Sequence, residues 1–191
     1  MAADLVLGLP RGGVVVAAEV ARELKLPLDV LVVRKIGHPL QREFAIGALA
    51  EPDVFILDEN SVSEIPLVRF QLEEIATEET ARLREYCARF RPAAAPLLKD
   101  KTVLLVDDGL ATGATAEAAA LSARKQNARK IIIAAPVAST SAVTKLRHSA
   151  DEILALVVDP DFAAVGQYYE NFAQTTDEEV VELLSKATLR S

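Results

Sequence analysis

Short apolar runs alternate with longer amphipathic stretches along most of the chain. The runs are rich in Val, Leu and Ile, have the length of buried strands, and lie at 5–9, 28–33, 102–106, 130–135 and 153–158. Helices are expected at 14–25, from about residue 116, after Ser139 or Thr140, and at 177–186. This alternation predicts an α/β fold, in which helices cover both faces of a central, mainly parallel sheet.

Three stretches do not follow this alternation. Residues 45–50 and 54–57 predict a short hairpin at one edge of the fold, and residues 36–44 predict an exposed loop that could close as a lid. Residues 60–90 predict a mostly helical segment with an apolar stripe. Core packing is the favoured role of that stripe, and a homodimer surface is the alternative.

Composition narrows the classes of protein to which the chain could belong. The 191 residues carry a net charge of −7, which excludes a general binder of nucleic acid or of anionic membranes. A single cysteine, Cys87, rules out an intramolecular disulfide and indicates a reducing compartment. With no apolar run near membrane-spanning length and no signal pattern, we expect one cytoplasmic domain over residues 1–191, without nucleic-acid or membrane partners.

The most informative stretch follows the run at 102–106. Two carboxylates, Asp107 and Asp108, precede a loop of small residues, and that loop leads into an alanine-rich helix. The loop is Gly109, Leu110, Ala111, Thr112, Gly113, Ala114 and Thr115. Unpaired N–H groups and the helix dipole make such a strand–loop–helix junction an anion site. Paired acids beside a phosphate make sense if the ligand also presents hydroxyl donors, as the diol of a ribose 5-phosphate does.

Other interpretations of this loop fit less well. A Walker A loop needs a lysine before its final Ser or Thr, and Ala114 stands there instead. The dinucleotide fingerprint G-x-G-x-x-G is absent from the loop as well. A plain strand-to-helix turn with an Asp-Gly corner is the alternative without function.

A second strand–glycine loop–helix unit stands at the start of the chain. Arg11, Gly12 and Gly13 follow the first strand, so N–H groups and a guanidinium could bind a second anion together. The alternative is a tight turn with a solvated arginine. Arg34 and Lys35 follow the apolar run at 28–33, where open α/β sheets bind ligands, although a solvated basic pair is again possible.

Aromatic residues gather after the last predicted strand. Phe162 and three other aromatic residues lie within residues 159–172. They could stack on a planar base beside a ribose site, or they could form a small satellite core that anchors the terminal helix. We expect residues 159–191 to form a C-terminal hood segment followed by that helix.

These motifs together resemble the type I phosphoribosyltransferases. The match to their binding motif for 5-phosphoribosyl diphosphate (PRPP) covers Val103 to Thr115. Leu-Pro-Arg-Gly-Gly, Val-Arg-Lys and Ala-Val-Gly-x-x-Tyr extend the likeness to an uncharacterised bacterial subgroup. Members usually have a further segment before the first strand, which helps to form the hood over the site. Here that strand begins within a few residues of Met1, so an incomplete hood is expected.

The resemblance implies a role for each motif. Asp107 and Asp108 would hold the ribose diol, and the loop from Gly109 to Thr115 would hold the 5-phosphate. Arg11, Gly12 and Gly13 would bind pyrophosphate, with Arg34 and Lys35 neutralising departing charge. Phe162 and Val165 are the candidates for the base pocket.

The resemblance also implies an activity. The enzyme would move ribose 5-phosphate from PRPP to a nucleobase-like molecule, with Mg²⁺ held mainly by PRPP oxygens and without direct protein ligands. The alternative from a different class is a non-catalytic regulator that binds PRPP or a nucleotide.

Overall fold

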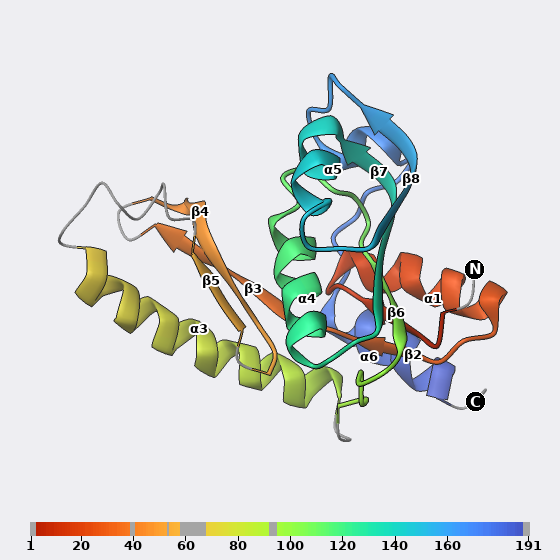
Figure 1. Ribbon diagram of the computed structural model, residues 1–191, viewed down its shortest axis with the longest axis horizontal. Coiled ribbons are helices and arrows are strands. Elements are labelled where there is room, and N and C mark those ends of the chain that lie inside the picture. Colours follow the sequence, from red (N-terminus) through yellow and green to blue (C-terminus); the bar gives the residue numbers. More distant parts are fainter. Residues whose placement is uncertain (1–2, 39–40, 53, 58–67, 92–94, 189–191) are drawn as a thin grey trace.

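The computed structural model describes residues 3–38, 41–52, 54–57, 68–91 and 95–188 (Figure 1). A five-stranded parallel sheet, in the order β2-β1-β6-β7-β8, comprises β1 (Leu5–Gly8), β2 (Leu28–Val30), β6 (Thr102–Val106), β7 (Lys130–Ser139) and β8 (Glu152–Asp159). The helices are α1 (Gly12–Leu24), α3 (Val68–Phe90), α4 (Ala114–Lys125), α5 (Thr140–Leu146) and α6 (Asp177–Thr188), with a 3₁₀ turn η1 (Val165–Tyr168). The predicted α/β class is confirmed.

Alternating side chains of the central strands divide the core between two faces. Leu105 and Ile133 belong to the face that packs against α4 and α5, through residues such as Ala119 and Leu146. Their neighbours Leu104 and Ile132 belong to the opposite face, where the alanines of α1 pack. Because both faces of the sheet are covered, the sequences of its central strands are continuous apolar runs rather than an alternation of apolar and polar residues.

A second, three-stranded sheet is antiparallel and extends away from the first (Figure 1). It comprises β3 (Val33–His38), β4 (Gln41–Ala50) and β5 (Val54–Leu57), and α3 packs against β3 and β4. The predicted hairpin between residues 45–50 and 54–57 is confirmed. The predicted loop at 36–44 is wrong for most of its length, because pairing of β3 with β4 satisfies this backbone despite a register shift at Gly37. Residues 39–40 lie outside the described part of the chain.

The apolar run at 28–33 does not form one strand. Leu31 still donates its N–H to the Gly8 carbonyl oxygen at 3.1 Å, but Val32 donates its N–H to Glu51 Oε1 at 2.9 Å. The chain therefore leaves the parallel sheet after β2 and enters the antiparallel one. As a result, Arg34 and Lys35 lie within β3 rather than at the carboxyl end of a parallel strand.

Two other boundaries differ from the sequence-based expectation. β7 continues beyond the predicted residues to Ser139, because its later residues pair with β8 as far as Asp159. The predicted helix at 60–90 is observed from Val68, and its earlier part lies outside the described residues.

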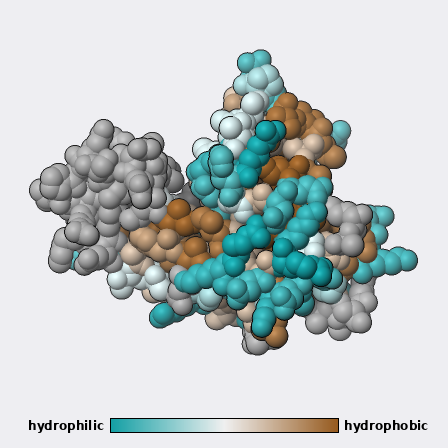
Figure 2. Space-filling model, in the orientation of Figure 1, coloured by the Kyte–Doolittle hydropathy of each residue, from teal (hydrophilic) through white to brown (hydrophobic). Residues whose placement is uncertain are grey.

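The outer strand β8 exposes several apolar side chains. Leu156 is 88% exposed, and Val157 and Val158 are exposed next to it. Figure 2 shows hydrophobic surface gathered in the region where Figure 1 draws this strand. Within the described segments, no helix combines the length and apolarity that a membrane span requires.

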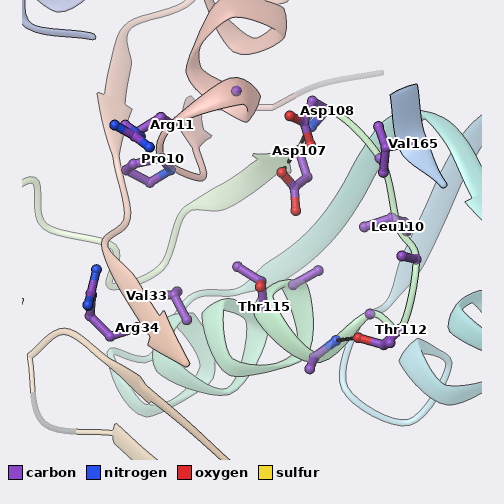
Figure 3. A pocket seen from close by; sticks show the side chains of 16 residues that line it. Pro10, Arg11, Val33, Arg34, Asp107, Asp108, Leu110, Thr112, Thr115 and Val165 are labelled. Atoms are coloured by element: carbon purple, nitrogen blue, oxygen red, sulfur yellow. Dashed lines mark hydrogen bonds between the residues drawn. The ribbon is translucent and has the colours of Figure 1, made fainter. Parts of the chain in front are cut away.

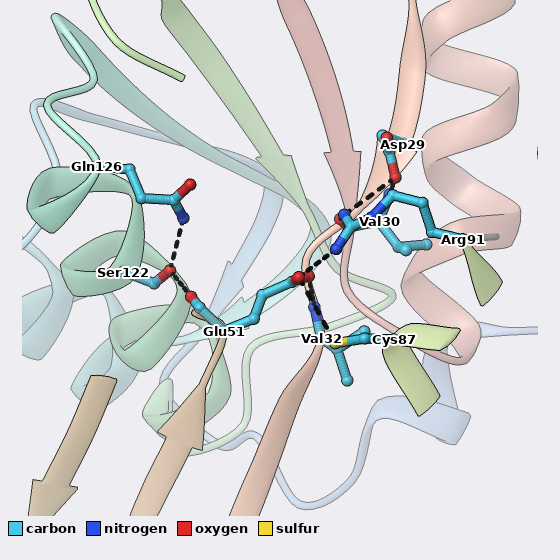
Figure 4. A network of polar contacts seen from close by, with 8 residues as sticks. All are labelled: Asp29, Val30, Val32, Glu51, Cys87, Arg91, Ser122 and Gln126. Atoms are coloured by element: carbon cyan, nitrogen blue, oxygen red, sulfur yellow. Dashed lines mark hydrogen bonds and ion pairs between the residues drawn. The ribbon is translucent and has the colours of Figure 1, made fainter. Parts of the chain in front are cut away.

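A buried polar network joins the two sheets at Glu51 (Figure 4). The Arg91 guanidinium donates to Glu51 Oε2 and, at 3.2 Å, to the Val30 carbonyl oxygen. The Arg91 side chain is only 9% exposed, and that of Glu51 only 11%. Burial and the Glu51 charge raise the pKa of the adjacent Cys87 thiol to about 12, which keeps it protonated rather than nucleophilic.

Replacement of Arg91 with methionine should destabilise the protein strongly. Glu51 would remain buried without its counter-charge, which costs about 3–5 kcal/mol of the free energy of unfolding. Chemical denaturation would measure the loss. Arg84, exposed on the same helix α3, provides the control. An equal effect of Arg84→Met would contradict the prediction.

Candidate functional site

A cavity of about 470 Å³ opens at the carboxyl ends of β1 and β6 (Figure 3). Regions of the chain that are distant in sequence form its walls. The described lining residues are Pro10, Arg11, Gly12, Val33, Arg34, residues 107–116 and Val165. The two glycine loops predicted to bind anions therefore open into one space.

The loop between β6 and α4 lines the cavity along its whole length. Gly113 has φ +72°, a left-handed conformation that favours glycine, and it directly precedes α4. Leu110 N–H donates to the Val137 carbonyl oxygen at 2.9 Å, and Ser139 Oγ donates to the Ala111 carbonyl oxygen at 2.6 Å. These bonds to β7 hold the loop, and the first residues of α4, up to Ala116, line the cavity with it.

The two carboxylates of the site point in different directions (Figure 3). Asp107 extends into the cavity, whereas Asp108 lies toward the loop that contains Gly12. Asp108 N–H donates to Asp107 Oδ1 at 2.9 Å, which fixes the two residues relative to each other. Burial raises the pKa of Asp108, so its ionised form is disfavoured by the surroundings.

Tyr169, from the segment that follows β8, contacts the backbone of Asp108. Its hydroxyl donates to the Asp108 carbonyl oxygen at 2.6 Å. Burial and the charges of Asp108 and Asp107 raise the pKa of Tyr169 to about 12, so the hydroxyl remains a donor. The sequence indicated Tyr169 as one residue of an aromatic cluster and as the tyrosine of Ala-Val-Gly-x-x-Tyr, but nothing local to it predicts this bond.

Glycine is required where the loops approach one another. A Cβ atom on Gly12 would stand 1.9 Å from Asp108 Oδ2. One on Gly13 would stand 2.7 Å from the Val106 carbonyl oxygen, and one on Gly109 would stand 2.6 Å from Val165 Cγ1. The predicted glycines thus allow close contact between the loops.

Two arginines supply positive charge to the cavity. Arg11 and Arg34 line it, with side chains 34% and 30% exposed. Arg34 Nε donates to Glu79 Oε2 at 2.9 Å, and its guanidinium lies 5.2 Å from the centre of the Tyr86 ring. Lys35 lies beside Arg34 in β3, and its side chain is outside the described part of the structure.

The two residues expected at a base pocket have different positions. Val165 lines the cavity opposite Gly109. Phe162 is not among the described lining residues; its ring stacks on that of Tyr168 with centroids 5.6 Å apart. Tyr168 in turn donates a hydrogen bond to Asp159 Oδ2. Phe162 therefore belongs to a small aromatic cluster within the hood segment.

A second cavity of about 430 Å³ adjoins the first. The two share Arg11, Gly12 and Asp108, so these residues form the wall between them. The far side of the second cavity consists of Tyr169 and residues 171–175, with Val15 and Val16 of α1. The sequence did not indicate this space, because it depends on how the hood segment crosses α1.

Most of the chain matches one known protein family. Residues 2–172 fit the family model for the phosphoribosyl transferase domain. The chain belongs to this family. No group of three or more His, Cys, Asp or Glu side chains suited to holding a metal occurs within the described residues.

Two relatives resemble most of the chain. The Mycobacterium tuberculosis protein Rv0571c, whose own assignment as a phosphoribosyl transferase is provisional, is 44% identical over 186 residues. That match covers 97% of this chain but only 42% of the relative's length. The crystal structure of TT1426 from Thermus thermophilus is also 44% identical, with a TM-score of 0.81 and coverage of 97% of this chain and 88% of the other.

A methyl group at Gly12 should damage the site without unfolding the protein. In Gly12→Ala the added carbon collides with the Asp108 carboxylate, so either the loop or Asp108 must move. Overpacking of this kind costs about 1–3 kcal/mol of the free energy of unfolding, and chemical denaturation would measure the loss. The control is Glu19→Ala, at a position 65% exposed on the same helix, and equal stabilities of both variants would contradict the prediction.

Proposed function

We propose that this protein is a phosphoribosyltransferase that moves ribose 5-phosphate from PRPP to a nitrogenous base and releases pyrophosphate. One observation carries the proposal. Asp107 and Asp108 stand between a small-residue loop at a helix start and a second glycine loop bearing Arg11, all around one cavity. The acids suit a diol, and the loops suit phosphate groups on either side of it.

The ligand groups are assigned to the parts of the cavity that match them chemically. The 5-phosphate would bind the N–H groups and hydroxyls of the loop from Gly109 to Thr115. The ribose 2′ and 3′ hydroxyls would donate to Asp107 and Asp108. The pyrophosphate would lie near the Arg11–Gly13 loop, with Arg34 and Lys35 on the side of β3.

Transfer then requires one bond to form and one to break. A ring nitrogen of the base bonds to C1′ of the ribose as the bond from C1′ to the pyrophosphate oxygen breaks, and the electron pair leaves with pyrophosphate. The proton that this nitrogen carried passes to water. Arg11 and Arg34 stabilise the charge that develops on the leaving group, and Asp107 stabilises positive charge at the ribose ring. Mg²⁺ prefers hard oxygen ligands, and the carboxylates are of that kind, but PRPP oxygens would supply most of its ligands. The bound ion would add further positive charge at the pyrophosphate.

The acceptor is assigned to the side of the cavity near the hood segment. Val165 presents an apolar surface opposite Gly109, which suits one face of a planar base. Phe162 would contribute only through its stacking on Tyr168. Homodimer formation and a cytoplasmic location also remain part of the proposal.

Titration of Mg·PRPP, followed by a screen of free bases for pyrophosphate release, tests the function. Micromolar to millimolar binding with release for one base is expected, as is usual for enzyme substrates. Binding without release for any base would favour the regulatory alternative. Lack of PRPP binding would contradict both.

Asp108→Asn should weaken PRPP binding and stabilise the free protein. Loss of a hydrogen bond to a charged group lowers affinity by roughly tenfold to a hundredfold. Burial raises the pKa of Asp108 in the folded protein above its value in the unfolded chain. Ionisation of Asp108 therefore lowers the free energy of unfolding as the pH rises from the unfolded pKa through the folded one. The Tm of the variant should therefore exceed that of the wild type at neutral pH and match it in acid.

The matched control for this substitution is Asp161→Asn, at an exposed position of the hood segment. It should change neither Tm nor affinity. Unchanged PRPP binding by Asp108→Asn would rule out the assigned contact with the ribose diol.

A further inference from the structure

A carboxylate outside the cavity lies directly behind Arg11. Asp177, the first residue of α6, places Oδ1 3.7 Å from Arg11 Nη1. The Asp177 side chain is only 11% exposed. Among the described residues, it is the one acidic group that forms an ion pair with Arg11. The C-terminal helix thus reaches the loop that follows the first strand.

The distance between these two charges determines what their interaction can do. At 3.7 Å the pair is attractive but too long for a normal hydrogen bond. Asp177 Oδ1 is buried and has no hydrogen-bond partner within the described structure. Asp177 therefore attracts the guanidinium without occupying the N–H donors that an anion in the cavity would need.

Asp177 is itself held in place by one other ion pair and by the capped helix end at which it stands. Its Oδ2 accepts a hydrogen bond from Arg89 Nη1 of α3. At the start of α6, Thr176 and Glu179 form a capping box, with Glu179 N–H donating to Thr176 Oγ1 at 3.2 Å and Thr176 N–H donating to Glu179 Oε2 at 2.7 Å. The carboxylate is thus a fixed charge rather than a mobile one.

The second arginine of the cavity has the same kind of support. Glu79 of α3 accepts from Arg34 Nε, the nitrogen nearest the stem, and is in turn bound by Arg82 Nη1 at 2.5 Å. The ring of Tyr86 lies near both Arg34 and Arg89, at 5.2 Å and 6.0 Å from their guanidinium carbons. Both arginines of the cavity are therefore oriented by acids outside it, and α3 contributes to each arrangement.

We propose that Asp177 is a positioning residue, which holds the Arg11 guanidinium ready to bind the pyrophosphate group. This inference rests on the proposed function only for the identity of the anion. The fixed carboxylate limits the orientations open to the guanidinium, so less conformational entropy is lost when the anion binds. No contact between Asp177 and the ligand is involved.

The test is the isosteric variant Asp177→Asn, with two probes measured by calorimetry. Affinity for Mg·pyrophosphate should fall about threefold to tenfold, the range expected for a partly buried ion pair. Affinity for ribose 5-phosphate, which lacks the pyrophosphate, should stay unchanged. Loss of affinity for both probes to the same extent would indicate a merely structural role and overturn the proposal.

The control Glu178→Gln removes the same charge from the next residue of α6, which is exposed. Removal of negative charge near an anion site should by itself raise affinity slightly, so the control should bind pyrophosphate as tightly as the wild type or more tightly. If Asp177 positions Arg11, Asp177→Asn should instead lower the affinity for pyrophosphate. Equal or tighter binding by Asp177→Asn would overturn the proposal.

The double variant shows whether Asp177 acts through Arg11. In an Arg11→Gln background, Asp177→Asn should cause no further loss of pyrophosphate affinity. A further loss of the same size would overturn the proposal. Pyrophosphate binding by a wild type that transfers ribose 5-phosphate to none of the bases would refute the transferase function and leave this inference intact. Absence of pyrophosphate binding would refute the inference.

Discussion

The parallel pairing of β1 with β6 is the constraint on which the site depends. These strands are far apart in sequence, yet Gly8 lies opposite Val106, so both end at the same level of the sheet. Leu9 N–H continues the pairing by donating to the Val106 carbonyl oxygen at 2.9 Å. The loops that follow must therefore leave the sheet side by side, and Arg11 and Asp107 come to face one cavity.

Close contact between those loops has an energetic consequence. Gly12 leaves room for the Asp108 carboxylate, and the hood segment covers the same residue through Tyr169. Burial raises the Asp108 pKa, so the folded protein holds an acid in unfavourable surroundings. Hydrogen bonds from the backbone N–H groups of Asp108 and Gly109 offset only part of that cost.

The antiparallel sheet, with α3 packed against it, forms the wall of the cavity that contains Arg34. The chain leaves the parallel sheet after Val30, and the Glu51–Arg91 pair fixes that junction. This departure brings Arg34 to the cavity wall and α3 behind it. The described acids behind the arginines, Glu79 and Asp177, come from helices that do not line the cavity.

The sequence by itself determined the parallel sheet, the two glycine loops and the acid pair. Each is encoded locally, because apolar runs define buried strands, and glycines and acids at a strand end define a loop with its chemistry. The tertiary structure alone decided that residues 33–38 pair as β3, that Phe162 stacks on Tyr168, and that Tyr169 and Asp177 support the site. These features depend on contacts between residues far apart in the chain. A local sequence pattern does not predict which distant strand or side chain a given residue will contact.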